Sequence, residues 1–297
     1  QVGPGTVLGF LGPNGAGKST TMRMIAGYLA PDRGSVEVHG HDVLRDPDRA
    51  QAAIGYMPES AALYDDMTVQ SFLHFVARVR GFHGTARCKR VANVIERCFL
   101  QDVRRQSIAT LSKGYRRRTC FAQALLHDPP VLLLDEPTEG LDPNQKQVVR
   151  ELIRGMGRDR IIMLSTHVLE EVEAVCSRVI IISNGRIVAD NSPAELKRRS
   201  STHQMLDVTL EAPRKEACEV FRRMDRVRKV EADALASGRL HLRLRPVEGA
   251  SLTEDVLQVS HTNRWQLHDL VVHEGRLDEV FKQITTTEDA VPGAKTS

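Results

Sequence analysis

The sequence contains few aromatic residues and no long hydrophobic run. Aromatic residues make up 4% of the 297 residues, too few to favour a stacking platform for single-stranded nucleic acid. The longest apolar runs, residues 131–134 and 179–182, have the length of buried strands. They fall far short of the roughly 18 residues that a membrane-spanning helix needs. With no recognisable signal peptide either, the sequence predicts no membrane-spanning segment within the chain.

An excess of one charge is lacking as well. The 41 Lys and Arg residues against 38 Asp and Glu residues give a net charge of +3, which is too even to indicate a nucleic-acid binder. The apolar fraction of 41% is typical of a soluble globular protein, and the length predicts about two domains. Because the chain starts with Gln1 and a motif follows only eleven residues later, we expect the natural N-terminus and the first strands to lie upstream.

The cysteines give no sign of a disulfide or metal framework. They are odd in number, and no pair has CxxC spacing. This pattern predicts reduced, buried thiols in a cytosolic protein, and it applies to Cys88, Cys98, Cys120, Cys176 and Cys218.

Short apolar runs alternate with helical patterns over the first two thirds of the chain. This alternation predicts an α/β fold with a largely parallel sheet covered by helices, and we assign it to residues 1–200. A helical subdomain is expected at about 68–126, where Thr68 suits a helix N-cap. The expected strands cover residues 6–11, 35–38, 54–57, 131–134, 161–165 and 179–183, and a helix is expected at 18–29.

The last third of the chain has a different pattern. After a polar stretch at 197–202, the predicted order of elements is β-α-β-β-α-β, followed by a short helix at 277–284. That order predicts a small α+β accessory domain of the split-βαβ type at 203–285. The remaining residues, 286–297, are polar and are expected to be disordered.

A glycine-rich loop carries the strongest functional signal. It fits the pattern G-x-x-x-x-G-K-[ST] and lies between a predicted strand and a predicted helix, the context of a P-loop. In such a loop the backbone N–H groups surround phosphates, the lysine contacts the β- and γ-phosphates, and the serine hydroxyl is a Mg²⁺ ligand. The residues are Gly12, Pro13, Asn14, Gly15, Ala16, Gly17, Lys18, Ser19 and Thr20.

Two carboxylates follow the buried strand predicted at 131–134. Ligands bind at the carboxyl ends of strands in open parallel sheets, which is where Asp135 and Glu136 are expected. Asp135 is expected to hold Mg²⁺, and Glu136 to polarise the attacking water as a general base or a positioning group. Together with the P-loop, this strand predicts a Walker B site.

Three further segments show which P-loop family the chain resembles. Leu-Ser-Lys-Gly-Tyr-Arg at 111–116 resembles the LSGGQ signature of ABC-type ATPases, with Lys113 and Tyr115 in place of the usual Gly and Gln. Gly140-Leu141-Asp142 resembles the D-loop, and Ser165-Thr166-His167 resembles the switch-histidine segment. These segments have the order and spacing of the family, so residues 1–200 or so resemble an ABC ATPase.

The resemblance implies specific partners and roles. ABC ATPase domains form head-to-tail homodimers or heterodimers around two ATP molecules, so Ser112 and Gly114 are expected to reach the γ-phosphate bound to the partner chain. Asp142 of the D-loop is expected at a nucleotide-binding position. His167 is expected to contact the γ-phosphate and to orient the catalytic water. The implied cofactors are ATP and Mg²⁺. The family usually has Gln where this chain has Glu59, which we expect to be a further oxygen ligand of Mg²⁺.

A finer resemblance points to the type 2 exporter subfamily, including gliding-associated and multidrug-type members. The residues that carry it are the 111–116 segment, Glu59, residues 139–145 and Leu-Asp-Glu-Val-Phe at 277–281. This resemblance implies an ATPase subunit that is peripheral to the cytoplasmic face of the membrane and works with separate integral membrane permease subunits, with no nucleic acid expected. The alternatives are a soluble ABC ATPase acting on ribosomes or DNA, and a non-hydrolysing regulator. The basic clusters at 116–118 and 197–199 are expected to be solvated or paired with nearby acids, with lipid headgroups as the alternative.

Overall fold

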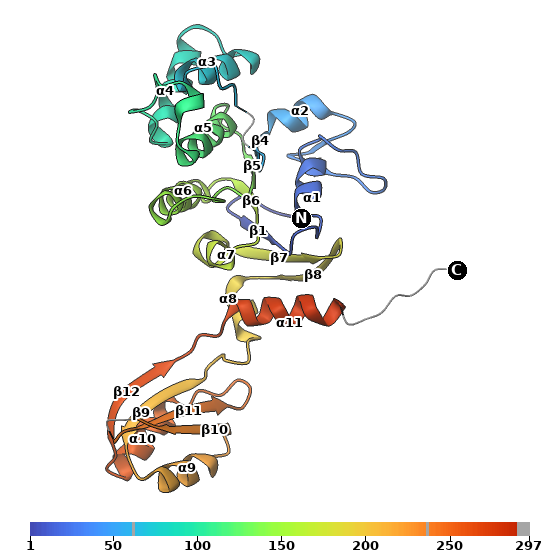
Figure 1. Ribbon diagram of the computed structural model, residues 1–297. Coiled ribbons are helices and arrows are strands. Elements are labelled where there is room, and N and C mark those ends of the chain that lie inside the picture. Colours follow the sequence, from blue (N-terminus) through green and yellow to red (C-terminus); the bar gives the residue numbers. More distant parts are fainter. Residues whose placement is uncertain (61–62, 236–237, 290–297) are drawn as a thin grey trace. The chain divides into compact units, whose positions relative to one another are not determined.

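The chain divides into two compact units. A computed structural model describes residues 1–60, 63–235 and 238–289, and the units are Gln1–Pro193 and Ala194–Ser297 (Figure 1). Among the described residues, no helix combines the length and the apolar character required to cross a bilayer.

A six-stranded sheet forms the centre of the first unit, with the strand order β4-β5-β6-β1-β7-β8. The first five strands in this order are mutually parallel, and only β8 is antiparallel to its neighbour. The carboxyl ends of the parallel strands therefore meet at one edge of the sheet. The bounds are β1 Val7–Leu11, β4 Ile54–Met57, β5 Val131–Asp135, β6 Ile161–Thr166, β7 Arg178–Ser183 and β8 Arg186–Asn191.

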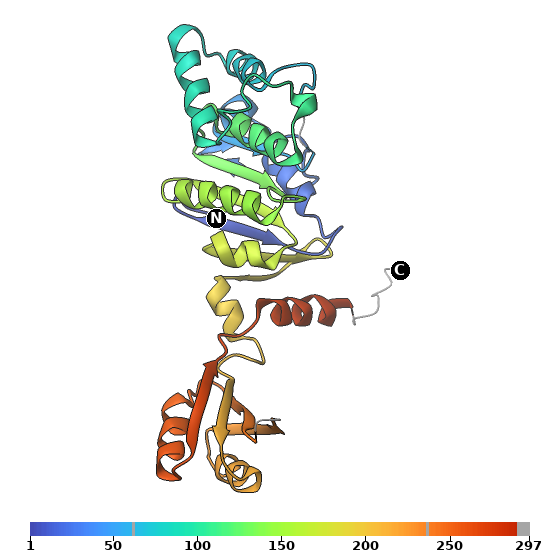
Figure 2. The same ribbon diagram turned by 60° about the vertical axis from the view of Figure 1, so that its left-hand side comes forward.

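Helices cover both faces of this sheet. Helices α6 (Pro143–Met156) and α7 (Leu169–Val175) lie against one face, and α1 (Lys18–Ile25) lies against the other (Figures 1 and 2). Strand side chains alternate between two hydrophobic clusters because the side-chain period of a strand is two residues: Leu132 and Leu134 of β5 pack with α6 residues, whereas Leu133 packs with Met22 of α1. Burial on both faces explains why these strands read as continuous apolar runs.

A helical subdomain is inserted between β4 and β5. It consists of α3 (Val69–Val79), α4 (Gly84–Arg97), a 3₁₀ turn at Ile108–Thr110 and α5 (Lys113–Leu125). The Thr68 hydroxyl accepts a hydrogen bond from the Ser71 amide at 3.1 Å, which makes Thr68 the predicted N-cap. A peripheral segment between α1 and β4 contains a two-stranded hairpin, β2 (Glu37–Val38) with β3 (His41–Asp42), and α2 (Pro47–Ala52).

The second unit contains a four-stranded antiparallel sheet with the order β10-β11-β9-β12. Alternate residues of β9 and β11, such as Val208 and Leu242, form one buried cluster with Phe221 of α9 and Val256 of α10. The chain order is β-α-β-β-α-β within this sheet. The bounds are α8 Pro193–Arg198, β9 Leu206–Glu211, α9 Arg214–Arg222, β10 Val227–Ala234, β11 Leu240–Pro246, α10 Thr253–Thr262, β12 Gln266–Val272 and α11 Leu277–Asp289.

The structure differs from the sequence-based expectations in several elements. The strand expected at 35–38 covers only Glu37–Val38, and β3 and α2 were not predicted. Helix α11 includes residues 286–289 of the segment predicted to be disordered, because this polar stretch contains no glycine or proline; residues 290–297 lie outside the described part. Helix α1 ends at Ile25 instead of Leu29, and Gly27 follows with a φ of 76°. The five cysteines are free, but Cys88 on α4 is exposed instead of buried.

Candidate functional site

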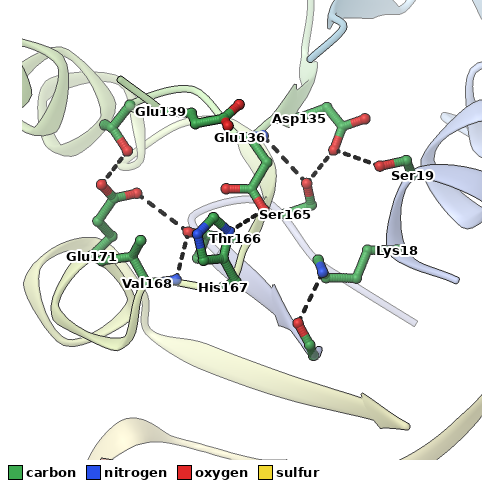
Figure 3. Close-up of polar contacts among 12 residues, drawn as sticks. Lys18, Ser19, Asp135, Glu136, Glu139, Ser165, Thr166, His167, Val168 and Glu171 are labelled. Atoms are coloured by element: carbon green, nitrogen blue, oxygen red, sulfur yellow. Dashed lines mark hydrogen bonds and ion pairs between the residues drawn. The ribbon is translucent and has the colours of Figure 1, made fainter. Parts of the chain in front are cut away.

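The predicted phosphate-binding, acidic and histidine residues come together at the carboxyl edge of the parallel sheet. Most of them line a cavity of about 340 Å³. Figure 3 shows polar contacts of Lys18, Ser19, Asp135, Glu136 and His167 with one another and with neighbouring residues. The lining residues of the cavity come from the loop after β1 and from segments after β4, β5 and β6: Asn14, Gly15, Gly17, Lys18, Ser19, Thr20, Glu59, Glu136, Glu139 and His167.

The glycine-rich loop connects β1 to α1, and backbone carbonyl groups of the loop hold the Lys18 side chain. A Cβ at Gly12 would lie 2.4 Å from the carbonyl oxygen of Ile182, so only glycine fits there. Gly17 has a φ of 106°, in the left-handed region that glycine adopts without strain. Lys18 is only 7% exposed, and its Nζ donates hydrogen bonds to the carbonyl oxygens of Gly12, at 2.8 Å, and Pro13, at 3.1 Å. The loop thus places a full positive charge beside the amino end of α1, which favours anions.

Asp135, the last residue of β5, is fully buried next to the start of α1. Its Oδ1 accepts a hydrogen bond from the Ser19 hydroxyl at 3.2 Å and another from the Ser165 hydroxyl. The hydroxyl and carboxylate oxygens of Ser19 and Asp135 are the hard ligands that Mg²⁺ prefers. Both residues lie where the sequence predicts a metal site.

Glu136 follows immediately and has an unusual backbone. Its φ of 46° lies in the left-handed region, and its amide donates to the carbonyl oxygen of Ser165 at 3.1 Å. Its side chain meets the His167 ring, with 2.9 Å between Oε1 and Nδ1. Burial raises the pKa of Glu136 above its usual value, and the hydrogen bond to His167 and the charge of Lys18 act in the opposite direction. The site therefore contains a carboxyl group with increased basicity next to a histidine.

A buried hydroxyl–carboxylate network, which the sequence analysis did not predict, supports the segment around His167. Glu171 of α7 is 3% exposed and accepts hydrogen bonds from the hydroxyls of Thr138 and Thr166. The Thr166 hydroxyl also accepts from the amide of Val168 at 3.0 Å (Figure 3). This network joins the segment after β5 to the segment after β6, and so fixes the two segments that carry Glu136 and His167.

Of the predicted nucleotide-binding residues, Gly12, Pro13 and Ala16 belong to the loop without lining this cavity, and Ser112, Gly114 and Asp142 lie in other segments. Ser112 is the N-cap of α5 and accepts from the Tyr115 amide, and Asp142 is the N-cap of α6 and accepts from the Gln145 amide. Gly114 packs so tightly that a Cβ there would lie 2.4 Å from Oε1 of Gln145. Within one chain, then, the described residues do not bring these three to the P-loop.

Three residues at or beside the cavity were not predicted from the sequence. Ser165 was noted only as part of a motif, and its contact with Asp135 depends on the β5–β6 register. Glu139 lines the cavity, and Arg117 lies next to Glu139. Arg117 was predicted to be solvated or paired with an acid. It is paired, at 3.6 Å from Glu139, and with 5% exposure it is buried and not solvated.

The fold and the loop together define a P-loop nucleotide-binding protein. Residues 1–139 match the family described as "ABC transporter". The chain is 31% identical to the linearmycin resistance ATP-binding protein LnrL of Bacillus subtilis over 283 residues, 95% of this chain and 90% of LnrL. The chain therefore belongs to the family of ABC transporter ATP-binding proteins.

Other comparisons agree with this family. The chain is 39% identical over 198 residues to Nod factor export ATP-binding protein I of Paraburkholderia xenovorans, which covers 66% of this chain and 65% of that protein. A solved structure titled "Structure of ATP binding subunit of ABC transporter" matches with a TM-score of 0.60 and 30% identity over 66% of this chain and 82% of the other. The chain spans less than two thirds of the length of several relatives it matches.

Proposed function

We propose that this chain binds and hydrolyses ATP and powers an ABC-type membrane exporter through ATP-driven dimerisation. The observation that carries this proposal is the cavity that Lys18, Ser19, Glu136 and His167 line together. The Glu136–His167 pair is in contact there, and the buried Asp135 lies behind the lining, hydrogen-bonded to Ser19. Each group has a separate task in phosphoryl transfer, which depends mainly on positioning and electrostatic stabilisation.

The loop residues would bind the nucleotide phosphates. Lys18 would exchange its contacts with loop carbonyl oxygens for contacts with the β- and γ-phosphates, and free backbone N–H groups of the loop would donate to the same oxygens. Ser19 and Asp135 fit Mg²⁺ because their oxygens already lie 3.2 Å apart. Glu59, which is exposed and lines the cavity, would add a further oxygen ligand. The ion would supply charge neutralisation on the phosphates.

Glu136 would activate the attacking water. Its carboxylate is shielded from solvent, and burial makes it more basic. A general base works best when its pKa approaches the operating pH. His167, whose ring contacts Glu136 and lines the same cavity, would orient the water and contact the γ-phosphate.

The contact between His167 and Glu136 leads to a pH-dependent prediction. Hydrolysis requires the Glu136 carboxylate, so activity should fall as the pH decreases through its pKa. The hydrogen bond from His167 lowers that pKa. In His167→Ala the pKa should rise, and the acid limb of the kcat profile should move to higher pH, on top of a lower maximal rate. Single-turnover hydrolysis across the pH range measures this shift.

A conservative variant provides the control. The amide of His167→Gln can still donate to Glu136, so its acid limb should move less than that of His167→Ala. If the limb stays in place in His167→Ala, or moves to lower pH, the hydrogen bond does not influence the base.

Dimerisation would complete the site. Ser112 caps α5 outside the chain's own cavity, and a helix N-terminus favours an anion. We infer that Ser112, Gly114 and Asp142 act at the nucleotide of a second subunit in a head-to-tail pair. The specific ATPase activity should then rise with protein concentration.

The variants Ser112→Asp and Ser112→Asn test this arrangement. Both residues are good N-caps, so both should preserve α5. Asp would place a negative charge against the partner's γ-phosphate and should abolish ATP-driven dimers and hydrolysis, whereas neutral Asn should retain both to a larger extent. Size-exclusion chromatography with ATP and phosphate-release assays give the result. Equal activity of the two variants, or hydrolysis by a strictly monomeric protein, would contradict the proposal.

Exporter coupling is supported by the relatives, which bear names of export and resistance proteins. We propose that the chain lies at the cytoplasmic face of the membrane, next to separate permease subunits. The alternative of a ribosome- or DNA-acting ATPase has no support among these relatives. Co-purification from detergent-solubilised membranes tests the proposal: recovery of an integral membrane protein is expected, and recovery of ribosomes instead would favour the alternative.

A further inference from the structure

Arg117 on α5 is almost completely buried, although it lies between two other arginines. It is 5% exposed. Arg116 pairs with the exposed Asp65 at 2.7 Å, and Arg118 stacks on the Tyr115 ring at 4.1 Å from the ring centre. A buried charge is costly unless it is paired or hydrogen-bonded. The partners of Arg117 must therefore replace the hydration of its guanidinium.

These partners belong to two segments that line the nucleotide cavity. Nη1 of Arg117 donates to the carbonyl oxygens of Pro58, at 3.3 Å, and Glu59, in the segment that follows β4. Nη2 donates to the carbonyl oxygen of Glu136 at 3.0 Å and lies 3.6 Å from Oε2 of Glu139. One guanidinium thus connects the segment after β4, the first turns of α5 and the segment after β5.

The contact with Glu136 is significant because of that residue's backbone. A non-glycine residue at a φ of 46° is uncommon and persists only when its surroundings hold it. The Glu136 amide is fixed by Ser165, and its carbonyl oxygen accepts from Arg117 and from the Glu139 amide at 3.2 Å. Arg117 is therefore the side chain that donates to the backbone carbonyl group of Glu136 and holds it in place.

We propose that Arg117 is a positioning residue that couples residues 58–59 to the orientation of the Glu136 carboxylate. The inference rests on the proposed function, in which Glu136 activates water. Arg117 takes no part in proton transfer: its planar fork binds carbonyl oxygens of both segments at once, so a shift of residues 58–59 is transmitted to the Glu136 backbone. The base is then aligned only when the segment after β4 is in place.

The test compares Arg117→Met with Arg118→Met in the full chain. Both changes remove one positive charge and a donor to a backbone carbonyl oxygen, since Arg118 donates to Phe99 at 2.9 Å, and both keep an unbranched apolar side chain. We expect kcat to fall by about 100-fold in Arg117→Met, the loss that a misplacement of about 1 Å causes. The ATP dissociation constant should change by less than about threefold, and Arg118→Met should hydrolyse ATP like the wild type.

A second variant covers the case in which Arg117→Met does not fold. Arg117→Lys keeps the charge but replaces the two-nitrogen fork by one ammonium, which cannot reproduce the bidentate geometry. It should recover only part of kcat, whereas Arg118→Lys should retain all of it. Full activity of Arg117→Lys would overturn the fork-based role.

The outcomes separate this inference from the proposed function. If the wild type hydrolyses ATP and Arg117→Met matches Arg118→Met, the positioning role is wrong and the ATPase assignment stands. If Arg117→Met loses ATP affinity and thermal stability together with kcat, the role of Arg117 is merely structural, and the inference is also overturned. A wild type without ATPase activity would remove the proposed function itself.

Discussion

Replacement of Glu136 by Gln should slow ATP hydrolysis by about 100- to 10,000-fold, the contribution of a positioned general base, while ATP affinity stays within about threefold. The amide has nearly the same shape as the carboxylate and can keep a contact with His167, which lies 2.9 Å away. It cannot accept the proton of the attacking water. Because ATP remains bound and uncleaved, the variant should also accumulate an ATP-bound dimer.

Glu151→Gln is the matched control for this prediction. Glu151 is exposed on α6 and accepts a hydrogen bond from Gln147, so its replacement removes the same charge away from the cavity. Single-turnover phosphate release measures the chemical step, and size-exclusion chromatography with ATP measures the dimer. A Glu136→Gln rate within about threefold of the control would exclude Glu136 as the base.

The environment of Glu136 explains why the two carboxylates after β5 can have different tasks. Asp135 is held by two serine hydroxyls and sits beside the start of α1. Glu136 is buried, meets a histidine and has a raised pKa. Different environments of neighbouring carboxyl groups are the pattern from which acid–base roles are assigned, and here they favour Glu136 as the proton acceptor.

Local sequence patterns were sufficient to predict the P-loop, the acidic strand end and His167. The P-loop lies within nine consecutive residues, and the three strands that lead to Lys18, Glu136 and His167 are short apolar runs. Parallel pairing of these strands brings their carboxyl ends to one edge, and the groups meet because β5, β6 and β1 are also neighbours in the sheet. The β-α-β-β-α-β order of the last third was also predictable from local patterns, because apolar and polar residues alternate clearly along β9 and β11.

Features that depend on packing between distant segments were not predictable. Three consecutive arginines indicate a solvated surface, and nothing local distinguishes Arg117 from its neighbours. Its burial arises because α5 packs against the segments after β4 and β5. The network of Glu171 with Thr138 likewise joins residues 33 positions apart. The short β3 strand and α2 were missed because two to six residues carry too weak a periodic signal.

Replacement of Lys18 by Met should weaken ATP binding by about 10- to 150-fold, which corresponds to the loss of one charge-assisted contact worth about 1.5–3 kcal/mol. Met keeps a side chain of similar length in a site that is only 7% exposed, so the loop should remain packed. It removes the ammonium group that donates to Gly12 and Pro13 and that would contact the phosphates. Hydrolysis should disappear at ATP concentrations that saturate the wild type.

Lys89→Met separates loss of the phosphate contact from loss of charge in general. Lys89 is exposed on α4, in the helical subdomain, and its replacement lowers the net charge by the same amount. Equilibrium binding of a fluorescent ATP analogue should be unchanged in Lys89→Met and weakened in Lys18→Met, with both variants folded by circular dichroism. If Lys18→Met binds ATP within about threefold of Lys89→Met, the ammonium of Lys18 does not hold the phosphates.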